Sequence, residues 1–296
     1  MSKQSFGGDW TEEKLERIRK YLSAYTTIMR KQGYFKYAYI DAFAGTGYRQ
    51  LKDKKEQGQL LLPELTEQEP QQLMDGSVRI ALQVEPRFDK YIFIEKDPDK
   101  TSELEKLKAE FTEKSEDIII VNEDANAYLQ NLCDTKNWQK HRAVLFLDPF
   151  GMQIPWSTIE LIAKTEAIDL WYLFPLGVAV NRLLKRDGNI KKSWRKRLDE
   201  LFGTDDWYDA FYAPKEQLSL FDYNSEQINE VKKISTYESI SKYFVKRLEN
   251  IFPGVAENPL VLHNSCNTPL YLLCFAAANP KGAKTAIRIA QDILKK

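Results

Sequence analysis

The chain has 296 residues, with 43 basic and 43 acidic side chains, 43% hydrophobic residues and 12% aromatic residues. This composition is typical of a globular protein with one large or two small domains, and it excludes a disordered chain and a collagen-like repeat. The balanced charge also argues against a surface that is basic all over, although it allows local basic patches.

Localisation follows from three features of the sequence. No run approaches the ~18 uninterrupted apolar residues of a membrane span. The first ten residues lack the apolar core of a secretory signal, and the three scattered cysteines, Cys133, Cys266 and Cys274, do not form a disulfide framework or a zinc motif. We therefore expect a reduced, cytoplasmic protein without a metal site and without membrane contact.

The first predicted elements are a helix and a strand. Apolar residues recur every three or four positions over 11–32, which predicts an amphipathic helix. The aromatic and β-branched run at 35–40 predicts a strand that ends in Asp41, and a glycine-rich turn with Gly45 and Gly47 follows it.

Four further apolar runs predict strands, and they lie at 91–94, 118–121, 143–147 and 168–174. Helices are expected between them, at 77–84, from a cap at Asp99 to 111, around 128–132, and at 156–164. Patterning is weak only over 48–76, which we interpret as an insertion or mobile lobe. Strands that alternate with helices and are rich in Val, Ile and aromatic residues predict a parallel sheet covered on both faces.

The end of the chain predicts a different arrangement. Residues 181–254 show helical patterning without a convincing strand, whereas 259–263 and 270–276 indicate a hairpin that precedes a terminal helix. The fold class is thus α/β, with a doubly wound, mostly parallel Rossmann-like sheet and a C-terminal β-hairpin. We expect residues 1–180 and 255–296 to form this domain, interrupted by a helical insertion at 181–254 that binds substrate or a partner.

Acidic residues follow four of the predicted strands: Asp41, Glu95, Asp124 and Asp148. Ligands of open parallel sheets bind beyond the carboxyl ends of the strands. After the first strand, Gly45 and Gly47 allow a backbone to approach a ligand closely. Gln50 stands where a dinucleotide fingerprint needs a third glycine, which disfavours NAD.

S-adenosylmethionine fits these acids better. Its ammonium, ribose diol and adenine amine each need an acceptor, and Asp41, Glu95 and Asp124 offer acceptors in that order. A single acid after a strand is more often a helix cap or a solvated turn than a ligand-binding residue, but three acids on successive strands favour one ligand. The candidate cofactor-binding residues are Asp41, Phe43, Gly45, Gly47, Glu95, Asp124 and Ala125.

These segments carry a family resemblance. Residues 41–47, 93–97, 123–127 and 147–151 resemble motifs I to IV of class I S-adenosylmethionine-dependent methyltransferases, in their usual order. The helix with Trp10, Lys14 and Tyr21, the 39–47 segment and Leu147-Asp-Pro-Phe-Gly more closely resemble the three-Cys-motif partner protein family, called TcmP. This resemblance covers residues 10 to about 180. It implies S-adenosylmethionine as cofactor, methyltransferase activity that is generally inferred from the fold, and a protein partner that carries a three-Cys motif.

Two features depart from the motifs of methyltransferases at large. Phe43 stands where a first glycine is often found, and the 48–76 insertion lengthens the separation of Asp41 and Glu95.

The segment Asp148-Pro149-Phe150-Gly151 bears on the chemistry. It resembles the Asp/Asn-Pro-Pro-Tyr/Phe motif of enzymes that methylate exocyclic base amines, and the Asp-Pro-Phe-Gly of tRNA guanine-N2 methyltransferases. The resemblance implies that Asp148 and the Pro149 carbonyl accept the amine protons while Phe150 stacks on a flipped base. An ordinary strand exit with a buried phenylalanine is the alternative. C5-methylation of cytosine is disfavoured because no cysteine lies in this loop.

A basic segment lies between 181 and 198. It contains eight basic residues but only one acidic residue, and Trp194 lies among them. Such a segment is typical of phosphate binding with base stacking, and a solvated helix face or a protein contact is the alternative. The candidate nucleic-acid-binding residues are Arg182, Lys185, Lys191, Lys192, Arg195, Lys196 and Arg197.

Together these features predict a methyltransferase that uses S-adenosylmethionine and N-methylates an exocyclic amine of a nucleic-acid base. Two other functions stay open. One is a catalytically idle scaffold that serves a partner protein, and the other is an enzyme that methylates a free small molecule.

Overall fold

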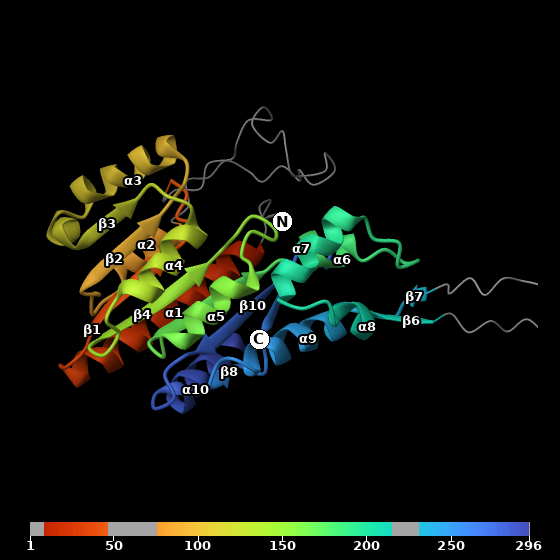
Figure 1. Cartoon of the computed structure of the whole chain (residues 1–296). Helices are drawn as coiled ribbons and strands as arrows, with labels where there is room; N and C mark the ends of the chain where they lie inside the picture. Colours follow the sequence, from red (N-terminus) through yellow and green to blue (C-terminus); the bar gives the residue numbers. More distant parts are fainter. Residues whose placement is uncertain (1–8, 47–75, 215–230, 296) are drawn as a thin grey trace, which may run out of the picture.

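The strands form one large mixed sheet with helices on both faces (Figure 1). A computed structural model describes residues 9–46, 76–214 and 231–295. The sheet contains β1 (Lys36–Asp41), β2 (Lys90–Ile94), β3 (Ile118–Val121), β4 (His141–Leu147), β5 (Ile168–Phe174), β8 (Gly254–Val255), β9 (Leu260–His263) and β10 (Pro269–Ala277). The five expected parallel strands and the expected hairpin are therefore all present.

The strand order is β3-β2-β1-β4-β5-β10-β8, and β9 also pairs with β10. Strands β1 to β5 are parallel, whereas β10 runs antiparallel to β5, β8 and β9. The chain runs outward from β1 through β2 to β3 and then returns to the other side of β1 with β4. This reversal between β1 and β4 is the point where open α/β sheets bind their ligands. The fold is thus Rossmann-like and doubly wound, as the sequence predicts.

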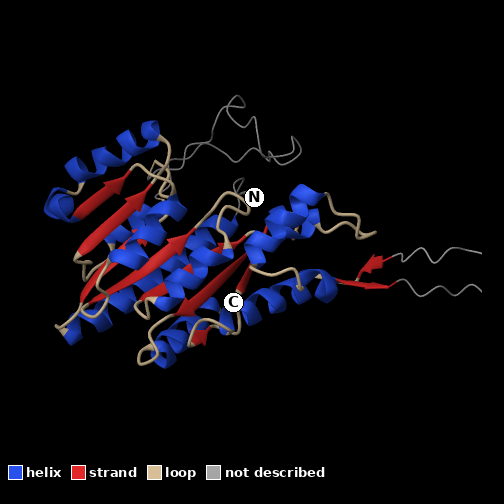
Figure 2. Ribbon diagram, viewed as in Figure 1, coloured by secondary structure: helices blue, strands red, loops and turns tan. Residues whose placement is uncertain are grey.

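Two apolar clusters lie on the two faces of the sheet, and Figure 2 shows the helices that cover them. One face is covered by α4 (Ala125–Thr135), α5 (Trp156–Lys164), α7 (Lys192–Phe202) and α9 (Tyr237–Glu249). The other is covered by α1 (Asp9–Gln32), α2 (Ser77–Gln83), α3 (Pro98–Glu110) and α10 (Ala283–Leu294). Shorter helical segments are η2 (Thr112–Asp117), the π-helical η3 (Leu176–Val180), α6 (Asn181–Leu183) and α8 (Trp207–Phe211). Because both faces are covered, all seven residues of β5 are buried.

The long N-terminal helix α1 has the amphipathic character that the sequence predicts. Its apolar stripe packs on the sheet, with Ile18 and Leu22 fully buried. The helix stops one residue before Gly33, whose φ of +56° is a left-handed conformation that glycine adopts easily. Three polar residues, Thr11, Lys14 and Thr26, lie on the same buried stripe.

Three sequence expectations need correction. Asp97, not Asp99, caps α3, because the Asp97 carboxylate accepts from the Asp99 backbone N–H and Pro98 occupies the first turn. The segment 181–254 does contain strands, since β6 (Tyr212–Pro214) and β7 (Val231–Lys233) pair antiparallel. At three residues each, these strands are too short to show an alternating pattern. The two-residue strand β8 was missed for the same reason.

The later part of 181–254 shares the core of the large sheet. Phe244 of α9 stacks on Phe174 of β5, with ring centroids 3.9 Å apart. Phe244 also meets Tyr172 edge-on at 5.6 Å. Helix α9 therefore covers the sheet as the other helices do. The insertion expected at 48–76 lies outside the described residues except for Gly76.

Within the described ranges, no helix combines the length and the apolar character needed to cross a membrane.

Candidate functional site

Asp41 organises the turn that follows β1. The residue is fully buried, and its Oδ1 accepts from the Phe43 backbone N–H at 3.2 Å. Its Oδ2 accepts from the Ser77 hydroxyl at 2.5 Å and from the Tyr39 hydroxyl at 3.2 Å. Burial raises the pKa of Asp41 to about 6, although the Ser77 hydrogen bond opposes this rise. Asp41 thus holds the glycine turn in place, and its contact with the methionine end of a cofactor stays a prediction.

Glu95 joins this turn from the next strand. Its Oε2 accepts from the Gly45 backbone N–H at 3.0 Å, and its Oε1 accepts from the Asp97 N–H at 2.9 Å. Asp41 pairs with Phe93 in the parallel register, so Glu95 lies next to the glycine turn although residues 48–76 intervene in the sequence. Oε1 also lies 3.9 Å from the Lys100 ammonium, and the Glu95 side chain is only 12% exposed. Contact of Glu95 with a ribose diol stays a prediction.

The backbone conformation at position 45 favours glycine. Its φ of +61° is left-handed, and a Cβ added there would meet no atom of the described residues within 4 Å. Among these residues, nothing fills the space next to this turn. Phe43 is half-buried against the core cluster beneath the turn. Gly47 lies outside the described residues.

Asp124 caps α4. Its Oδ1 accepts from the backbone N–H groups of Asn126 and Ala127, at 3.0 and 3.3 Å. Its Oδ2 lies 3.5 Å from the Lys96 ammonium, and the side chain is 47% exposed. The capping role that the sequence left open is thus present, while Ala125 is buried in the first turn of the helix. Contact of either residue with adenine stays a prediction.

The Asp148-Pro149-Phe150 segment directly follows β4. Asp148 Oδ2 accepts from the Lys14 ammonium at 2.5 Å, and Pro149 is buried. Phe150 is 72% exposed, and its backbone N–H donates to Gln153 Oε1 at 3.0 Å. The alternative of a strand exit with a buried phenylalanine is therefore wrong. A large aromatic ring faces solvent beside a paired carboxylate.

Lys14 is the site residue that sequence reasoning missed. Its side chain is only 5% exposed, and its ammonium lies 5.3 Å from the Trp10 ring centroid and 5.7 Å from that of Phe146. A signal existed, because Lys14 falls on the same helical stripe as Ile18 and a lysine there must be paired. Ser77 and Tyr39 were also missed, and no local pattern marks either of them.

The basic segment follows β5 through η3, α6 and α7. Its candidate side chains are all exposed except Arg195, which packs over the Tyr208 ring at 4.5 Å. The ammonium groups of Lys185 and Lys191 lie 5.1 and 5.0 Å from the Trp194 ring centroid. The fold thus places two lysines around the interleaved tryptophan. Figure 1 shows α6 and α7 beyond the carboxyl end of the parallel strands.

Strand β7 adds lysines that lie far away in the sequence. The Lys233 backbone N–H donates to the Arg186 carbonyl at 2.9 Å, and its ammonium donates to Asn181 Oδ1 at 2.6 Å. Burial and the charge of Arg186 lower the pKa of Lys233. Lys232 precedes it in the same strand. The basic surface is thus larger than residues 182–197 indicate.

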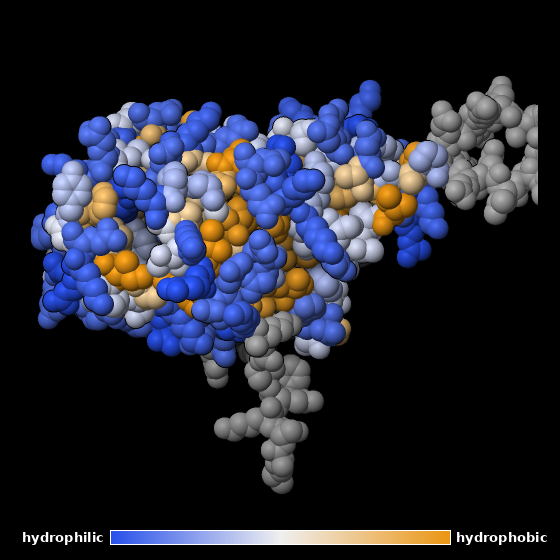
Figure 3. Space-filling model, turned by 90° about the horizontal axis from the view of Figure 1, so that it is seen from below, coloured by the Kyte–Doolittle hydropathy of each residue, from blue (hydrophilic) through white to orange (hydrophobic). Residues whose placement is uncertain are grey.

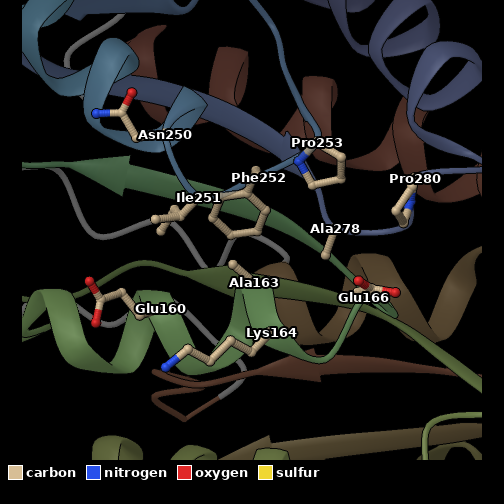
Figure 4. Close-up of a pocket in the computed structure, with 10 residues that line it drawn as sticks. All are labelled: Glu160, Ala163, Lys164, Glu166, Asn250, Ile251, Phe252, Pro253, Ala278 and Pro280. Atoms are coloured by element: carbon tan, nitrogen blue, oxygen red, sulfur yellow. The ribbon is translucent and has the colours of Figure 1, made fainter.

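Two surface hollows lie away from the strand-end acids. One, of about 600 Å³, is lined by α5, the 250–253 turn and the residues after β10 (Figure 4). Because β5 begins and β10 ends there, this hollow is at the opposite edge of the sheet. The other, of about 840 Å³, runs along β9 between α9 and the end of α10. Figure 3 looks onto this side and shows apolar residues between polar rims.

No group of three or more His, Cys, Asp or Glu side chains suited to a metal ion occurs within 9–46, 76–214 and 231–295.

Comparison with known proteins yields likeness of structure only. No family model matches the chain, and no curated protein matches it, so membership of the TcmP family stays a prediction. A Legionella pneumophila protein is 13% identical, with a TM-score of 0.48, over 95% of this chain and 91% of its own. An S-adenosylmethionine-dependent methyltransferase from Clostridium acetobutylicum is 12% identical, with a TM-score of 0.34, over 88% of this chain and 91% of its own. An rRNA methylase from Streptococcus thermophilus is 10% identical, with a TM-score of 0.30, over 73% of this chain and 94% of its own. The strand order of this chain establishes its fold independently of these likenesses.

Proposed function

We propose that the protein transfers a methyl group from S-adenosylmethionine to an exocyclic amine of a nucleic-acid base. The observation that carries this proposal is the end of β4, where Asp148 is paired with a buried lysine and is followed two residues later by the exposed Phe150. This end lies beside the glycine turn, since the Ala42 N–H donates to the Phe146 carbonyl at 3.2 Å. A candidate acceptor site and a candidate cofactor site therefore adjoin.

The residues around the glycine turn fit S-adenosylmethionine. No described residue fills the space next to Gly45, and the Glu95 carboxylate that accepts from the Gly45 N–H supplies the kind of acceptor that a ribose needs. Bound S-adenosylmethionine supplies an electrophilic methyl group on its sulfonium. The amine nitrogen forms the new N–C bond and loses one proton, while the S–C bond breaks and its electron pair stays on the sulfur.

Asp148 suits the acceptor side of this reaction. Its Oδ2 is held by Lys14, which leaves Oδ1 to accept a hydrogen bond from one amine N–H. The Pro149 carbonyl accepts a hydrogen bond from the other N–H in the motif that this segment resembles. Two such hydrogen bonds favour the geometry in which the nitrogen lone pair points at the methyl group. Holding two reactants in line supplies roughly 7 to 11 kcal/mol of a barrier.

Two surface features support a nucleic acid as the substrate. Phe150 is 72% exposed in a loop beside the acid, and stacking of a base on such a ring contributes about 1 to 3 kcal/mol. The basic segment with Trp194 lies at the same end of the sheet and suits a phosphate backbone. A free small molecule would not require this extended basic surface.

Titration calorimetry with S-adenosylmethionine and its demethylated product tests the cofactor. We expect wild-type protein to bind both, and Glu95→Ala to weaken binding at least about tenfold because two charge-assisted hydrogen bonds are lost. Absence of heat and of a thermal shift in the wild type would favour the idle scaffold.

Mass spectrometry of nucleic acid from cells with and without the protein tests the acceptor. We expect an N-methylated base that depends on the protein and disappears in Asp148→Ala. Cofactor binding together with methylated metabolites and unmodified nucleic acid would favour the small-molecule enzyme.

A further inference from the structure

Lys14 is a buried cation whose partner lies 134 residues away in the sequence. It lies in the second turn of α1, and its ammonium meets Asp148 Oδ2 at 2.5 Å. Burying a lysine is unfavourable unless it is paired, and apolar residues usually replace a buried pair without loss of stability. Stability alone is therefore a weak reason for a lysine here.

The surroundings of Lys14 restrict where its ammonium can point. Trp10 and Phe146 place ring centroids within 6 Å of it. Trp10 in turn stacks on Tyr271 of β10, with centroids 5.1 Å apart. Helix α1 and strands β4 and β10 thus form an aromatic enclosure that directs the ammonium toward Asp148.

Asp148 needs such a restraint. It is the first residue after β4, and its side chain is 30% exposed. The pairing with Lys14 restrains the χ angles of Asp148 and fixes which oxygen faces the protein. The neighbouring Asp41 carboxyl is close enough for the charge of Asp148 to act on it, so a cation between α1 and this loop also offsets repulsion between the two acids.

We infer that Lys14 is a positioning residue, which holds Oδ2 of Asp148 so that Oδ1 is presented to the exocyclic amine of the substrate. This inference rests on the proposed function and assigns Lys14 no contact with the reacting atoms. Its effect passes entirely through Asp148, so it should vanish when Asp148 is absent.

The test uses variants of full-length protein. Lys14→Met keeps a long, unbranched side chain that suits the aromatic enclosure, so we expect it to fold. Lys14→Arg keeps the charge and a donor for Asp148. Lys20→Met is the matched control, because Lys20 lies on the same helix with its side chain 48% exposed and pairs only with its helix neighbour Glu16 in the part of the chain that the structure describes.

Binding provides a readout that does not depend on turnover. The protein is titrated with pairs of oligonucleotides in the presence of S-adenosylhomocysteine. One member of each pair contains guanine, adenine or cytosine, and the other contains the matching base without the amine, which is hypoxanthine, purine or 2-pyrimidinone, respectively. For one pair we expect wild type and Lys20→Met to bind the amine-bearing base about tenfold more tightly, which corresponds to one hydrogen bond to a charged group. We expect this ratio to fall to nearly one in Lys14→Met and to be largely kept in Lys14→Arg.

Kinetics of the same variants complete the test. We expect Lys14→Met to lower kcat at least tenfold with unchanged KM for S-adenosylmethionine, and to leave the oligonucleotide affinity of an Asp148→Ala background unchanged. Undiminished amine discrimination in Lys14→Met, or an equal loss of oligonucleotide affinity in both backgrounds, would overturn the inference and leave the proposed function standing. A wild type that neither discriminates nor methylates would overturn both.

Discussion

Replacing Asp148 by Ala should destabilise the protein as well as stop turnover. The substitution removes the acceptor of an ammonium whose side chain is only 5% exposed. Lys14 would then be a buried charge walled by Trp10 and Phe146. The loss of stability arises from this stranded cation, because the aspartate itself is partly in solvent.

The magnitude follows from the burial of the two partners. Removing one partner of a fully buried pair costs about 3 to 5 kcal/mol. Two features make the cost smaller here. The Asp148 side chain is 30% exposed, so water can reach the unpaired ammonium. The cation–π contacts of Lys14 with the two rings remain in the variant and stabilise its charge by about 0.5 to 2 kcal/mol. We therefore expect a loss of about 2 kcal/mol, which lowers the Tm of a chain of this size by about 3 °C.

A double-mutant cycle separates this effect from catalysis. Urea unfolding and calorimetry are measured for wild type, Asp148→Ala, Lys14→Met and the double variant. We expect the double variant to regain most of the lost stability, since no buried charge remains, while turnover stays absent and cofactor affinity is kept in all four. Wild-type stability in Asp148→Ala, or a double variant no more stable than the single one, would refute the reasoning.

Three further outcomes are expected. Phe150→Ala should leave the Tm within about 1 °C because the ring is 72% exposed, and it should weaken oligonucleotide binding by about 1 to 3 kcal/mol in a fluorescence titration. Changing both Lys191 and Lys192 to Gln should flatten the plot of log affinity against log salt by about two, since each phosphate neutralised contributes about −0.9 to the slope. Burial raises the pKa of Asp169 to about 7, although the Tyr21 hydroxyl opposes this rise. The folded state therefore binds this proton more tightly, and the free energy of unfolding should fall between about pH 4 and 7, less steeply in Asp169→Asn, as urea unfolding at several pH values will show.

Matched controls accompany these variants. Tyr34→Ala removes another exposed ring, 61% accessible, and should not change oligonucleotide binding. The control variant with Lys106→Gln and Lys242→Gln changes exposed lysines outside the basic segment. It should leave the slope of log affinity against log salt unchanged. In Asp169→Asn a smaller pH dependence between about pH 4 and 6 should persist, since the raised pKa of Asp41 acts in the same direction.

The sequence by itself determined the layers of the fold. Parallel strands covered on both faces are rich in apolar residues, so each appears as a short apolar run, and β2 to β5 were found for this reason. Chain order also placed Asp41, Glu95 and Asp148 at one edge, because the carboxyl ends of parallel strands coincide. These features depend on local patterning, which a single chain displays directly.

Tertiary structure decided the partners and the exposure of these residues. Lys14 meets Asp148 across 134 residues, and Gly45 meets Glu95 across 50 residues. The structure shows that Phe150 is exposed and that Asp124 caps a helix. A phenylalanine after a strand can equally be buried, and an aspartate there can equally bind a ligand. Ion pairs, caps and exposed rings depend on which side chains the folded sheet brings within a few ångströms. Hydrophobic periodicity carries no information on that distance, because it records only which face of each element is buried.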